Sequence, residues 1–273
     1  MPLHPLNASP GTPVVVGIPF DANSSWLRGA AGAPPIIRVA FGSESSNSWT
    51  EAGLDLSVEG AYCDAGDLKF TFEESFAAIE HKIGELLDKE LRPVSLGGDH
   101  SITLPIIRAF AKRVPGLTIL HFDAHPDLYD ELEGNRHSHA CPFARIMEEG
   151  ACKRLIQVGI RTATGHQREQ AARFGVEVIE MQQLPALDRM KVAGPIYISF
   201  DMDVLDPAFA PGISHREPGG MSVREAIAHL HAITGKVAGA DIVEFNPAQD
   251  STQITAMVAA KLLKEILGKM IEN

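Results

Sequence analysis

The sequence contains few cysteines, and their spacing does not suggest cross-linking. Only three occur in 273 residues, Cys63, Cys141 and Cys152, and none of them belongs to a CxxC motif. Disulfide frameworks typically need an even number of closely spaced cysteines in a secreted chain. The cysteine content therefore favours a reducing compartment.

Long apolar runs and basic clusters are also lacking. No apolar stretch approaches the roughly 20 residues that a membrane span requires, and the first 13 residues lack the basic and apolar regions of a targeting peptide. The 24 basic and 35 acidic residues give a net charge of −11, without a basic patch. This balance disfavours nucleic acid and anionic membranes as partners. We therefore expect a cytoplasmic protein that binds neither.

Short apolar strands alternate with helical patterns along the chain. With 45% hydrophobic residues and no visible linker, we expect one α/β domain over residues 1–273. The predicted strands are 13–19, 93–96, 117–120, 155–160, 176–179, 196–200 and 237–243. The predicted helices are 34–40, 72–89 with Thr71 as its cap, 102–112, 167–174 and 254–271. Alternation of this kind predicts a mostly parallel sheet with helices on both faces.

The most informative stretch is a strand that ends in three metal-binding side chains spaced two residues apart. Residues 117–120 are apolar, and Asp123, His125 and Asp127 follow them. In an extended chain, residues two apart point the same way, so these side chains can converge. Carboxylates mixed with an imidazole suit a divalent ion, and parallel sheets place ligands at the carboxyl ends of their strands. The stretch therefore predicts a metal site at the sheet edge.

Two further strand ends carry acidic residues. The strand at 196–200 runs into Asp201 and Asp203, which share a face, and the strand at 237–243 ends in Glu244. Asp206 lies on the opposite face and precedes a proline, so we interpret it as a turn-forming residue.

A pair of glycines separates another predicted strand from a histidine. Gly97 and Gly98 follow residues 93–96, and His100 comes next but one. Their spacing matches neither GxGxxG nor GxxxxGKS/T, which disfavours a phosphate-binding loop. We expect the glycines to permit a tight backbone turn that brings His100 to the same point as the Asp123 cluster.

The four aspartates that would meet at this point carry a charge that needs compensation. Packed carboxylates repel one another and raise one another's pKa values unless cations are present. Two divalent ions would cancel the four charges, and a pair about 3.5–4 Å apart is the usual geometry of two-metal hydrolases. The mixture of Asp and His favours manganese over magnesium and leaves zinc possible. The alternative is that these acids are unrelated helix caps and turn residues.

Four motifs in this order resemble the signature of the ureohydrolases, the arginase and agmatinase family. They are residues 97–101 (GGDHS), 123–127 (DAHPD), 199–207 (SFDMDVLDP) and 244–247 (EFNP). The resemblance covers nearly the whole chain from Val14 onward. From Asp123 through Ile146, and from Pro207 to the end, it is closer to the plant-type arginases and their bacterial relatives. It implies a three-layer α/β/α sandwich with two manganese ions at the edge of the sheet.

The resemblance also implies a ligand set. One ion would be held by His100, Asp123, Asp127 and Asp201, and the other by Asp123, His125, Asp201 and Asp203. Asp123 and Asp201 would bridge the two ions.

Further roles follow from the same resemblance. An activated water would attack the guanidinium carbon of a small cationic guanidino substrate, with Asp127 orienting it, and urea and an amine would result. Glu244 would pair with the guanidinium, His139 would donate a proton to the leaving amine, and Asn135 would help to bind the substrate. His137 receives no role. The family also implies a homo-oligomer.

The choice of substrate rests on departures from the animal arginases. Those enzymes read the amino-acid head group with an asparagine and an acid, where this chain has Tyr129 and the acid-free segment 162–165. These departures resemble agmatinases, but the plant-type arginases share a longer similarity over residues 129–135. We therefore predict hydrolysis of L-arginine, with agmatine or another guanidino compound as the alternative.

Two other classes of function stay open at this stage. A deacetylase of the same fold would keep one zinc and would not need His100, Asp127 and Asp203 together as ligands. A non-catalytic scaffold could keep the fold while losing ligands, although here every ligand position is filled.

Overall fold

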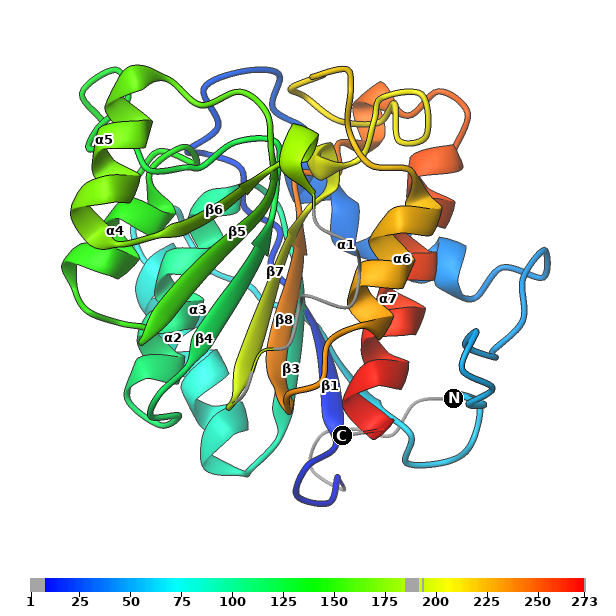
Figure 1. Cartoon of the computed structure of the whole chain (residues 1–273). Helices are drawn as coiled ribbons and strands as arrows, with labels where there is room; N and C mark the ends of the chain where they lie inside the picture. The colour runs from blue at the N-terminus through cyan, green and yellow to red at the C-terminus, as the bar shows by residue number, and fades with distance from the viewer. Residues whose placement is uncertain (1–7, 185–191, 193, 273) are drawn as a thin grey trace.

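A parallel sheet lies at the centre of the computed structural model, which describes residues 8–184, 192 and 194–272 (Figure 1). Eight strands follow one another in the order β2-β1-β3-β8-β7-β4-β5-β6, and each neighbouring pair is parallel. The strands are β1 (Pro13–Gly17), β2 (Cys63–Asp67), β3 (Arg92–Leu96), β4 (Thr118–Phe122), β5 (Arg154–Ile160), β6 (Glu177–Glu180), β7 (Ile196–Asp201) and β8 (Val237–Val243).

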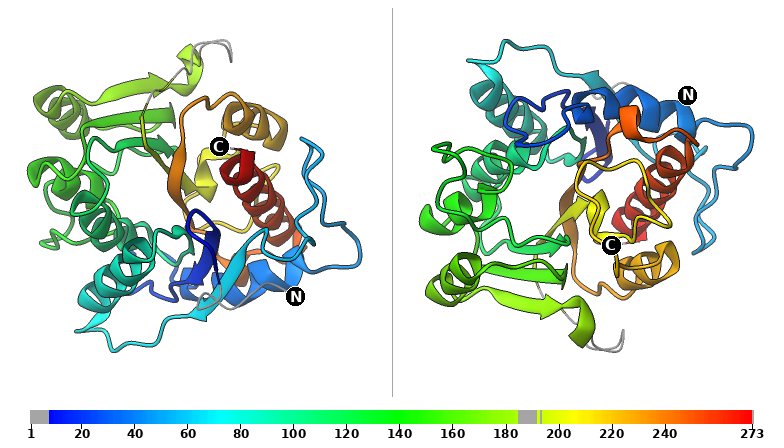
Figure 2. Two further views of the ribbon diagram at one scale, coloured as in Figure 1. Left: turned by 90° about the horizontal axis from the view of Figure 1, so that it is seen from below. Right: turned by 90° about the horizontal axis from the view of Figure 1, so that it is seen from above.

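Helices cover both faces of this sheet (Figures 1 and 2). One face carries α2 (Ser75–Asp88), α3 (Thr103–Ala111), α4 (Pro142–Glu148) and α5 (Gly165–Phe174). The other face carries α1 (Ala33–Phe41), α6 (Val223–His231) and α7 (Ile254–Glu272). The predicted three-layer α/β/α arrangement around a parallel sheet is confirmed. Within the described part of the chain, no helix combines the length and the apolar character needed to cross a membrane.

The core consists of two apolar layers, one on each side of the sheet. Successive residues of β4 alternate between them, because neighbouring side chains of a strand point to opposite faces. Leu120 and Phe122 pack in the layer under α1, α6 and α7, whereas Ile119 packs in the layer under α2 and α3. All five residues of β4 are buried, as expected for a central strand covered on both faces.

Four elements differ from the sequence prediction. Residues 142–148 were not among the predicted helices but form α4, where Pro142 occupies a first-turn position that tolerates proline. Neither β2 nor α6 was predicted: β2 contains two aspartates and a glycine, which mask a strand. The helix α2 begins at Ser75 rather than beside Thr71, whose hydroxyl instead donates to Glu74 Oε2 at 3.1 Å in the preceding turn.

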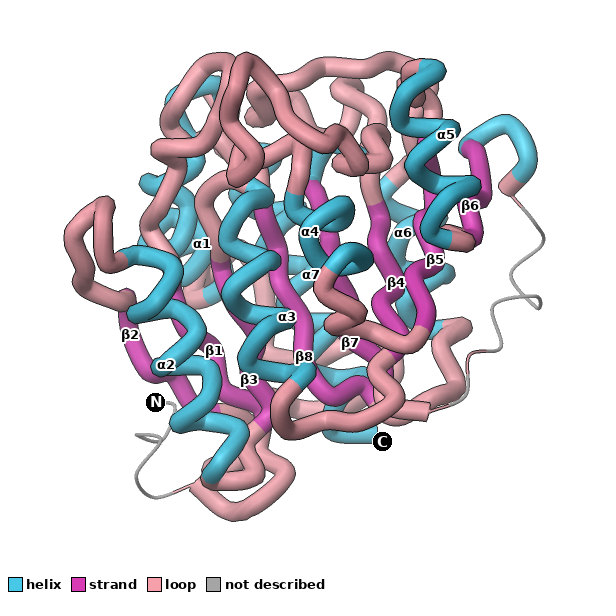
Figure 3. Tube along the Cα trace, turned by 90° about the vertical axis from the view of Figure 1, so that its left-hand side faces the viewer, coloured by secondary structure: helices cyan, strands magenta, loops and turns pink. Residues whose placement is uncertain are grey.

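The predicted site residues follow four adjacent strands. In the sheet, β3, β8, β7 and β4 are neighbours, although they are distant in the sequence. Figure 3 shows the loops gathered at one end of the sheet, where the carboxyl ends of these strands meet. This topology is what brings the sequence-predicted side chains into one place.

Candidate metal centre and substrate cavity

Three carboxylates surround one nitrogen of His100 at the carboxyl end of the sheet. His100 Nδ1 lies 3.2 Å from Asp123 Oδ2, 3.1 Å from Asp127 Oδ2 and 3.1 Å from Asp201 Oδ2. His100 and Asp123 are completely buried, and the other two carboxylates are nearly so. These are the four residues that the family resemblance assigned to the first ion.

The other nitrogen of His100 fixes the ring's tautomer. His100 Nε2 lies 3.0 Å from Ser199 Oγ, and Ser199 donates its own hydrogen to Asp241 Oδ1 at 2.8 Å. The serine oxygen must therefore accept from the histidine, so the ring hydrogen is on Nε2 and the lone pair of Nδ1 faces the carboxylates. Nδ1 is buried and has no hydrogen-bond partner among the described residues. A lone pair directed at three carboxylates fits a bound cation.

A second group of ligand atoms lies beside the first. His125 Nδ1 is 3.0 Å from Asp203 Oδ2 and 3.4 Å from Asp123 Oδ1. Backbone donors fix the carboxylates: Asp123 Oδ1 accepts from His125 N at 2.6 Å, and Asp201 Oδ1 accepts from Asp203 N at 2.8 Å. Asp123 thus contributes one oxygen to each group, which suits a bridging ligand.

The spacing of these atoms also fits divalent ions. Ligand atoms about 2.1 Å from one octahedral ion lie about 3 Å from one another, close to the separations around His100. The cluster Asp123, His125 and Asp203 has the same compactness.

The protein groups alone strongly perturb one another's pKa values. Burial raises the pKa of Asp201 well above its ordinary value, and the Asp203 and Asp123 carboxylates raise it further. Burial lowers the pKa of His100, but the surrounding carboxylates more than offset it and hold that pKa well above its ordinary value. Divalent cations would relieve this conflict, because they favour ionised carboxylates and a neutral imidazole.

His121 was missed by the sequence analysis although it lies against the centre. Its Nε2 is 2.7 Å from Asp123 Oδ2, and its Nδ1 is 3.0 Å from the side-chain nitrogen of Gln157. The amide donates to Nδ1, so Nε2 carries the hydrogen and donates to the carboxylate. The signal was present, since His121 has the same two-residue spacing from Asp123 as His125.

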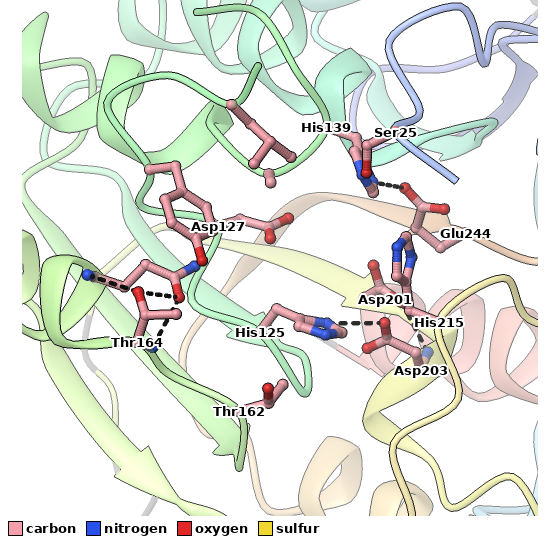
Figure 4. A pocket seen from close by; sticks show the side chains of 14 residues that line it. Ser25, His125, Asp127, His139, Thr162, Thr164, Asp201, Asp203, His215 and Glu244 are labelled. Atoms are coloured by element: carbon pink, nitrogen blue, oxygen red, sulfur yellow. Dashed lines mark hydrogen bonds and ion pairs between the residues drawn. The ribbon is translucent and has the colours of Figure 1, made fainter. Parts of the chain in front are cut away.

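A cavity of about 230 Å³ opens above the ligand residues (Figure 4). Its charged lining is acidic, and no Lys or Arg lines it among the described residues. The acidic lining residues are Asp127, Asp201, Asp203 and Glu244. Leu132 and Ala140 are the apolar part of the wall. Neutral polar side chains and histidines form the rest, namely Ser25, His125, Tyr129, His139, Thr162, Thr164, Gln167 and His215. Such a cavity favours a small cationic ligand.

His139 and Glu244 form an ion pair in this wall, as Figure 4 shows. His139 Nδ1 lies 3.0 Å from Glu244 Oε1, and the same oxygen accepts from His100 N at 2.9 Å. Burial lowers the pKa of His139, but the Glu244 carboxylate more than offsets it and raises that pKa to about 9. None of the described residues donates to Glu244 Oε2, which leaves this oxygen for a ligand.

Two of the site carboxylates lie on left-handed backbone. Asp127 has φ 49° and Glu244 has φ 63°, a region that non-glycine residues rarely adopt. Glu244 N donates to Gly98 O at 2.9 Å, and Phe143 N donates to Asp127 O at 3.2 Å, so hydrogen bonds support both conformations. Such conformations cluster at functional sites.

Gly98 has a steric role that differs from the predicted tight turn, since neither Gly97 nor Gly98 has a positive φ. A Cβ atom there would lie 1.7 Å from the carbonyl oxygen of Phe20. The loop after β1 therefore crosses directly over the turn that precedes His100, and only glycine leaves room for it. Asp206 behaves as predicted, because its carboxylate accepts from the backbone nitrogens of Ala208, Gly219 and Gly220 and closes a turn.

Other sequence-predicted residues lie farther from the cavity. Asn135 is exposed, does not line the cavity, and contacts Asn23 Oδ1 and His137 N. Its role in substrate binding stays a prediction. His215 and Ser25 line the cavity but were not predicted, because both lie on loops without strand periodicity.

Comparisons with known proteins agree with this geometry. The model of the arginase family matches residues 12–268. Arginase 1, mitochondrial, of Arabidopsis thaliana is 46% identical over 274 residues, covering 94% of this chain and 80% of that protein. An agmatinase of Bacillus cereus is 35% identical, covering 93% and 90%. The structure of an arginase from Medicago truncatula superimposes with a TM-score of 0.91 at 42% identity, covering 97% and 89%.

Proposed function

The chain belongs to the arginase family, and from this premise we propose that it hydrolyses L-arginine to ornithine and urea with two manganese ions. Ureohydrolase activity on a guanidino substrate follows from the family, whose matched members are named arginase and agmatinase. Arginine is favoured over agmatine because the plant arginases share more of this sequence than the bacterial agmatinases do.

The observation that carries the proposal is the acidic cavity above the paired ligand groups. A guanidinium is planar and permanently charged, and it pairs best with a carboxylate. Glu244 presents Oε2 to the cavity while His139 and the backbone nitrogen of His100 hold Oε1. The substrate would therefore bind with its guanidinium against Glu244 and over the metal ligands.

The ligand groups suit two ions. His100, Asp123, Asp127 and Asp201 would hold one ion, and Asp123, His125, Asp201 and Asp203 would hold the other. Two divalent ions would supply the Lewis acidity that makes a water nucleophilic near neutral pH. Carboxylates with an imidazole in each group favour manganese.

The remaining steps fall to side chains of this chain. Asp127 lies beside His100 Nδ1 and also lines the cavity, so it would accept a hydrogen bond from the attacking water and orient it. His139, held as an imidazolium by Glu244, would give a proton to the amine that leaves as urea forms. Rim hydroxyls such as those of Tyr129 and Thr162 would contact the far end of the substrate.

Urea release tests the proposal directly. The manganese-loaded protein is supplied in parallel with L-arginine, agmatine and shorter guanidino compounds, beside an Asp201→Ala variant that should be inactive. Preference for arginine would support the proposed arginase activity, and preference for agmatine would show that the protein is an agmatinase instead. No urea from any compound, with metal bound, would refute the ureohydrolase claim, and one zinc per chain would favour the deacetylase.

Two other expectations stay predictions. The plant arginase relatives are named mitochondrial, so the cytoplasmic location needs a localisation experiment. The homo-oligomer can be tested by sedimentation.

A further inference from the structure

The loop between β1 and η2 (Ala30–Gly32) holds His139 from outside the metal centre. His139 N donates to the carbonyl oxygen of Asn23 at 3.1 Å, and Asn135 Nδ2 donates to Asn23 Oδ1 at 3.3 Å. Two residues farther along, Ser25 Oγ lies 2.9 Å from His139 Nε2. The backbone and the ring of His139 are therefore both attached to one short segment, residues 23–25.

The two ring nitrogens of His139 have different partners. Nδ1 faces the carboxylate of Glu244 at 3.0 Å, and Nε2 faces the hydroxyl of Ser25 at 2.9 Å. An imidazole that donates Nδ1–H to a carboxylate retains that hydrogen and exchanges the one on Nε2. The mobile proton of His139 is therefore the one beside Ser25. His215 stacks on the ring with centroids 5.2 Å apart and does not hydrogen-bond to either nitrogen among the described residues.

Exposure separates the two residues of this pair. His139 is 7% exposed, whereas Ser25 is exposed and also lines the cavity. Figure 4 shows Ser25 beside the His139 ring. After giving a proton to the leaving amine, a buried histidine must recover one from solvent before the next turnover. Ser25 is exposed and its hydroxyl lies 2.9 Å from Nε2, so it is placed to connect Nε2 to water.

We propose that Ser25 returns the proton from solvent to His139 after each turnover. The inference rests on the proposed ureohydrolase function and on the role of His139 as the proton donor. In the returning step, a protonated buffer or hydronium ion gives a proton to the Ser25 oxygen, while the Ser25 O–H gives its own proton to His139 Nε2. The serine ends as it began, the buffer is left as its base, and the imidazolium is restored.

The relay is tested by chemical rescue of Ser25→Ala. Removal of the hydroxyl should lower kcat for arginine about tenfold or more, with KM changed less than about threefold, because proton transfer by a positioned group contributes at least this much. Raising the concentration of imidazole should restore most of the loss, since a small protonated buffer can reach Nε2 directly. A bulky buffer of the same pKa should not.

Two variants make the test specific. Ser25→Thr keeps a hydroxyl and should keep kcat within about threefold of the wild type. Ser24→Ala is the matched control: its hydroxyl lies 3.5 Å from Asp99 Oδ2 and does not contact His139, so it should behave like the wild type at every buffer concentration.

A readout that needs no turnover accompanies the kinetics. In metal-free protein labelled with ¹⁵N-histidine, the Nε2 resonance of His139 should shift in Ser25→Ala and stay unchanged in Ser24→Ala. A kcat for Ser25→Ala equal to that of the wild type, or a loss that imidazole does not restore, would overturn the relay. If the wild-type protein released no urea from any guanidino substrate, the proposed function would be refuted instead.

Discussion

The cavity has a floor and a rim that differ in charge, burial and origin. The floor consists of the predicted ligand residues at the ends of β3, β4 and β7. Four of them line the cavity, namely His125, Asp127, Asp201 and Asp203, and His100 and Asp123 are buried beside these four. The rim consists of Ser25, Tyr129, Thr162, Thr164 and His215, which lie on loops. The floor is acidic and mostly buried, whereas the rim residues carry no acidic or basic side chain other than the His215 imidazole, whose pKa burial lowers. The floor therefore determines the class of reaction, and the rim modulates the rate of turnover and which substrate is accepted.

The two regions also differ in how firmly their side chains are held. Asp123 contacts three histidine side chains and a backbone nitrogen at the floor. At the rim, Ser25 makes one side-chain hydrogen bond, to His139. Substitutions in the floor should therefore remove function outright, and substitutions at the rim should shift it in small steps.

The largest effect is expected for Asp123→Asn. The amide has the shape of the carboxylate but lacks the charge that both ligand groups share. Urea release should fall by about a thousandfold or more, because the contribution of metal ions amounts to several kcal/mol. Metal analysis of the purified variant should show less than one ion per chain. Full metal content with wild-type kinetics would mean that Asp123 is not a bridging ligand.

Glu244 lies between the floor and the rim, so Glu244→Gln should have an intermediate effect. It removes the charge opposite the guanidinium but contributes no predicted metal ligand. KM for arginine should rise about 10- to 100-fold, because the free energy of a charge-assisted hydrogen bond corresponds to a change of about this size. The metal content should stay at the wild-type level. Measuring both on one preparation distinguishes the outcomes, since a parallel loss of metal would place Glu244 in the floor.

The floor should also depend on residues behind it. Asp241 accepts hydrogen bonds from Ser199, Tyr197 and Thr103 and, through Ser199, fixes the tautomer of His100. Asp241→Asn should weaken metal binding about tenfold, as substitutions behind metal ligands typically do. Competition with a metal chelator measures this affinity. Ser95→Ala is a matched control, because its buried hydroxyl on β3 has no hydrogen-bond partner among the described residues. An equal effect in both variants would assign the loss to general packing.

The same contrast explains what the sequence could predict. Asp123, His125 and Asp127 follow an apolar strand at two-residue spacing, and Asp201 and Asp203 repeat the pattern, so strand periodicity alone indicates that they converge. The strand order in the sheet cannot be read from one chain, yet parallel strands share one carboxyl edge in any order. For this reason the residues of the floor could be predicted from the sequence, although the order of the strands in the sheet could not.

The rim offered no comparable signal. Ser25 and His215 are far apart in the sequence and lie on loops whose path depends on tertiary contacts, such as the close approach of Phe20 to Gly98. The helix α4 and the strand β2 were missed for a related reason, since short elements with proline, glycine or aspartate are stabilised by packing more than by local propensity. Sequence periodicity predicts helices and strands, whereas the rim residues lie on the loops between them.

The ion pair that joins floor and rim should make stability depend on pH in the metal-free protein. The pKa of His139 is raised to about 9 from an ordinary value of 6.5. A raised pKa stabilises the fold in full below about pH 6.5, and this contribution is lost as pH rises through about 9. The thermal midpoint of the wild type should exceed that of His139→Asn by a few degrees at pH 6. The difference should shrink by pH 9.5. A constant difference would mean that His139 is neutral in the folded protein.

The smallest effect is expected at the rim itself, for Thr162→Val. The change removes one hydroxyl from the cavity wall and keeps the shape of the side chain. A neutral hydrogen bond contributes about 0.5–1.5 kcal/mol, so KM for arginine should rise about two- to tenfold with kcat nearly unchanged. Thr162 is preferable to Thr164, whose side chain also caps α5 by accepting from Gln167 N.

Measuring Thr162→Val with agmatine as well as arginine shows which part of the substrate Thr162 contacts. Agmatine shares the guanidino group with arginine but lacks the carboxylate, so a rim hydroxyl that binds the head group should affect arginine alone. Equal changes for both substrates would show that Thr162 contacts the shared part of the molecule. A change in the arginine-to-agmatine ratio larger than about a hundredfold exceeds what one neutral hydrogen bond supplies. Such a change would mean that the rim has a strong electrostatic effect on substrate binding, as the floor does, although the rim side chains are neutral.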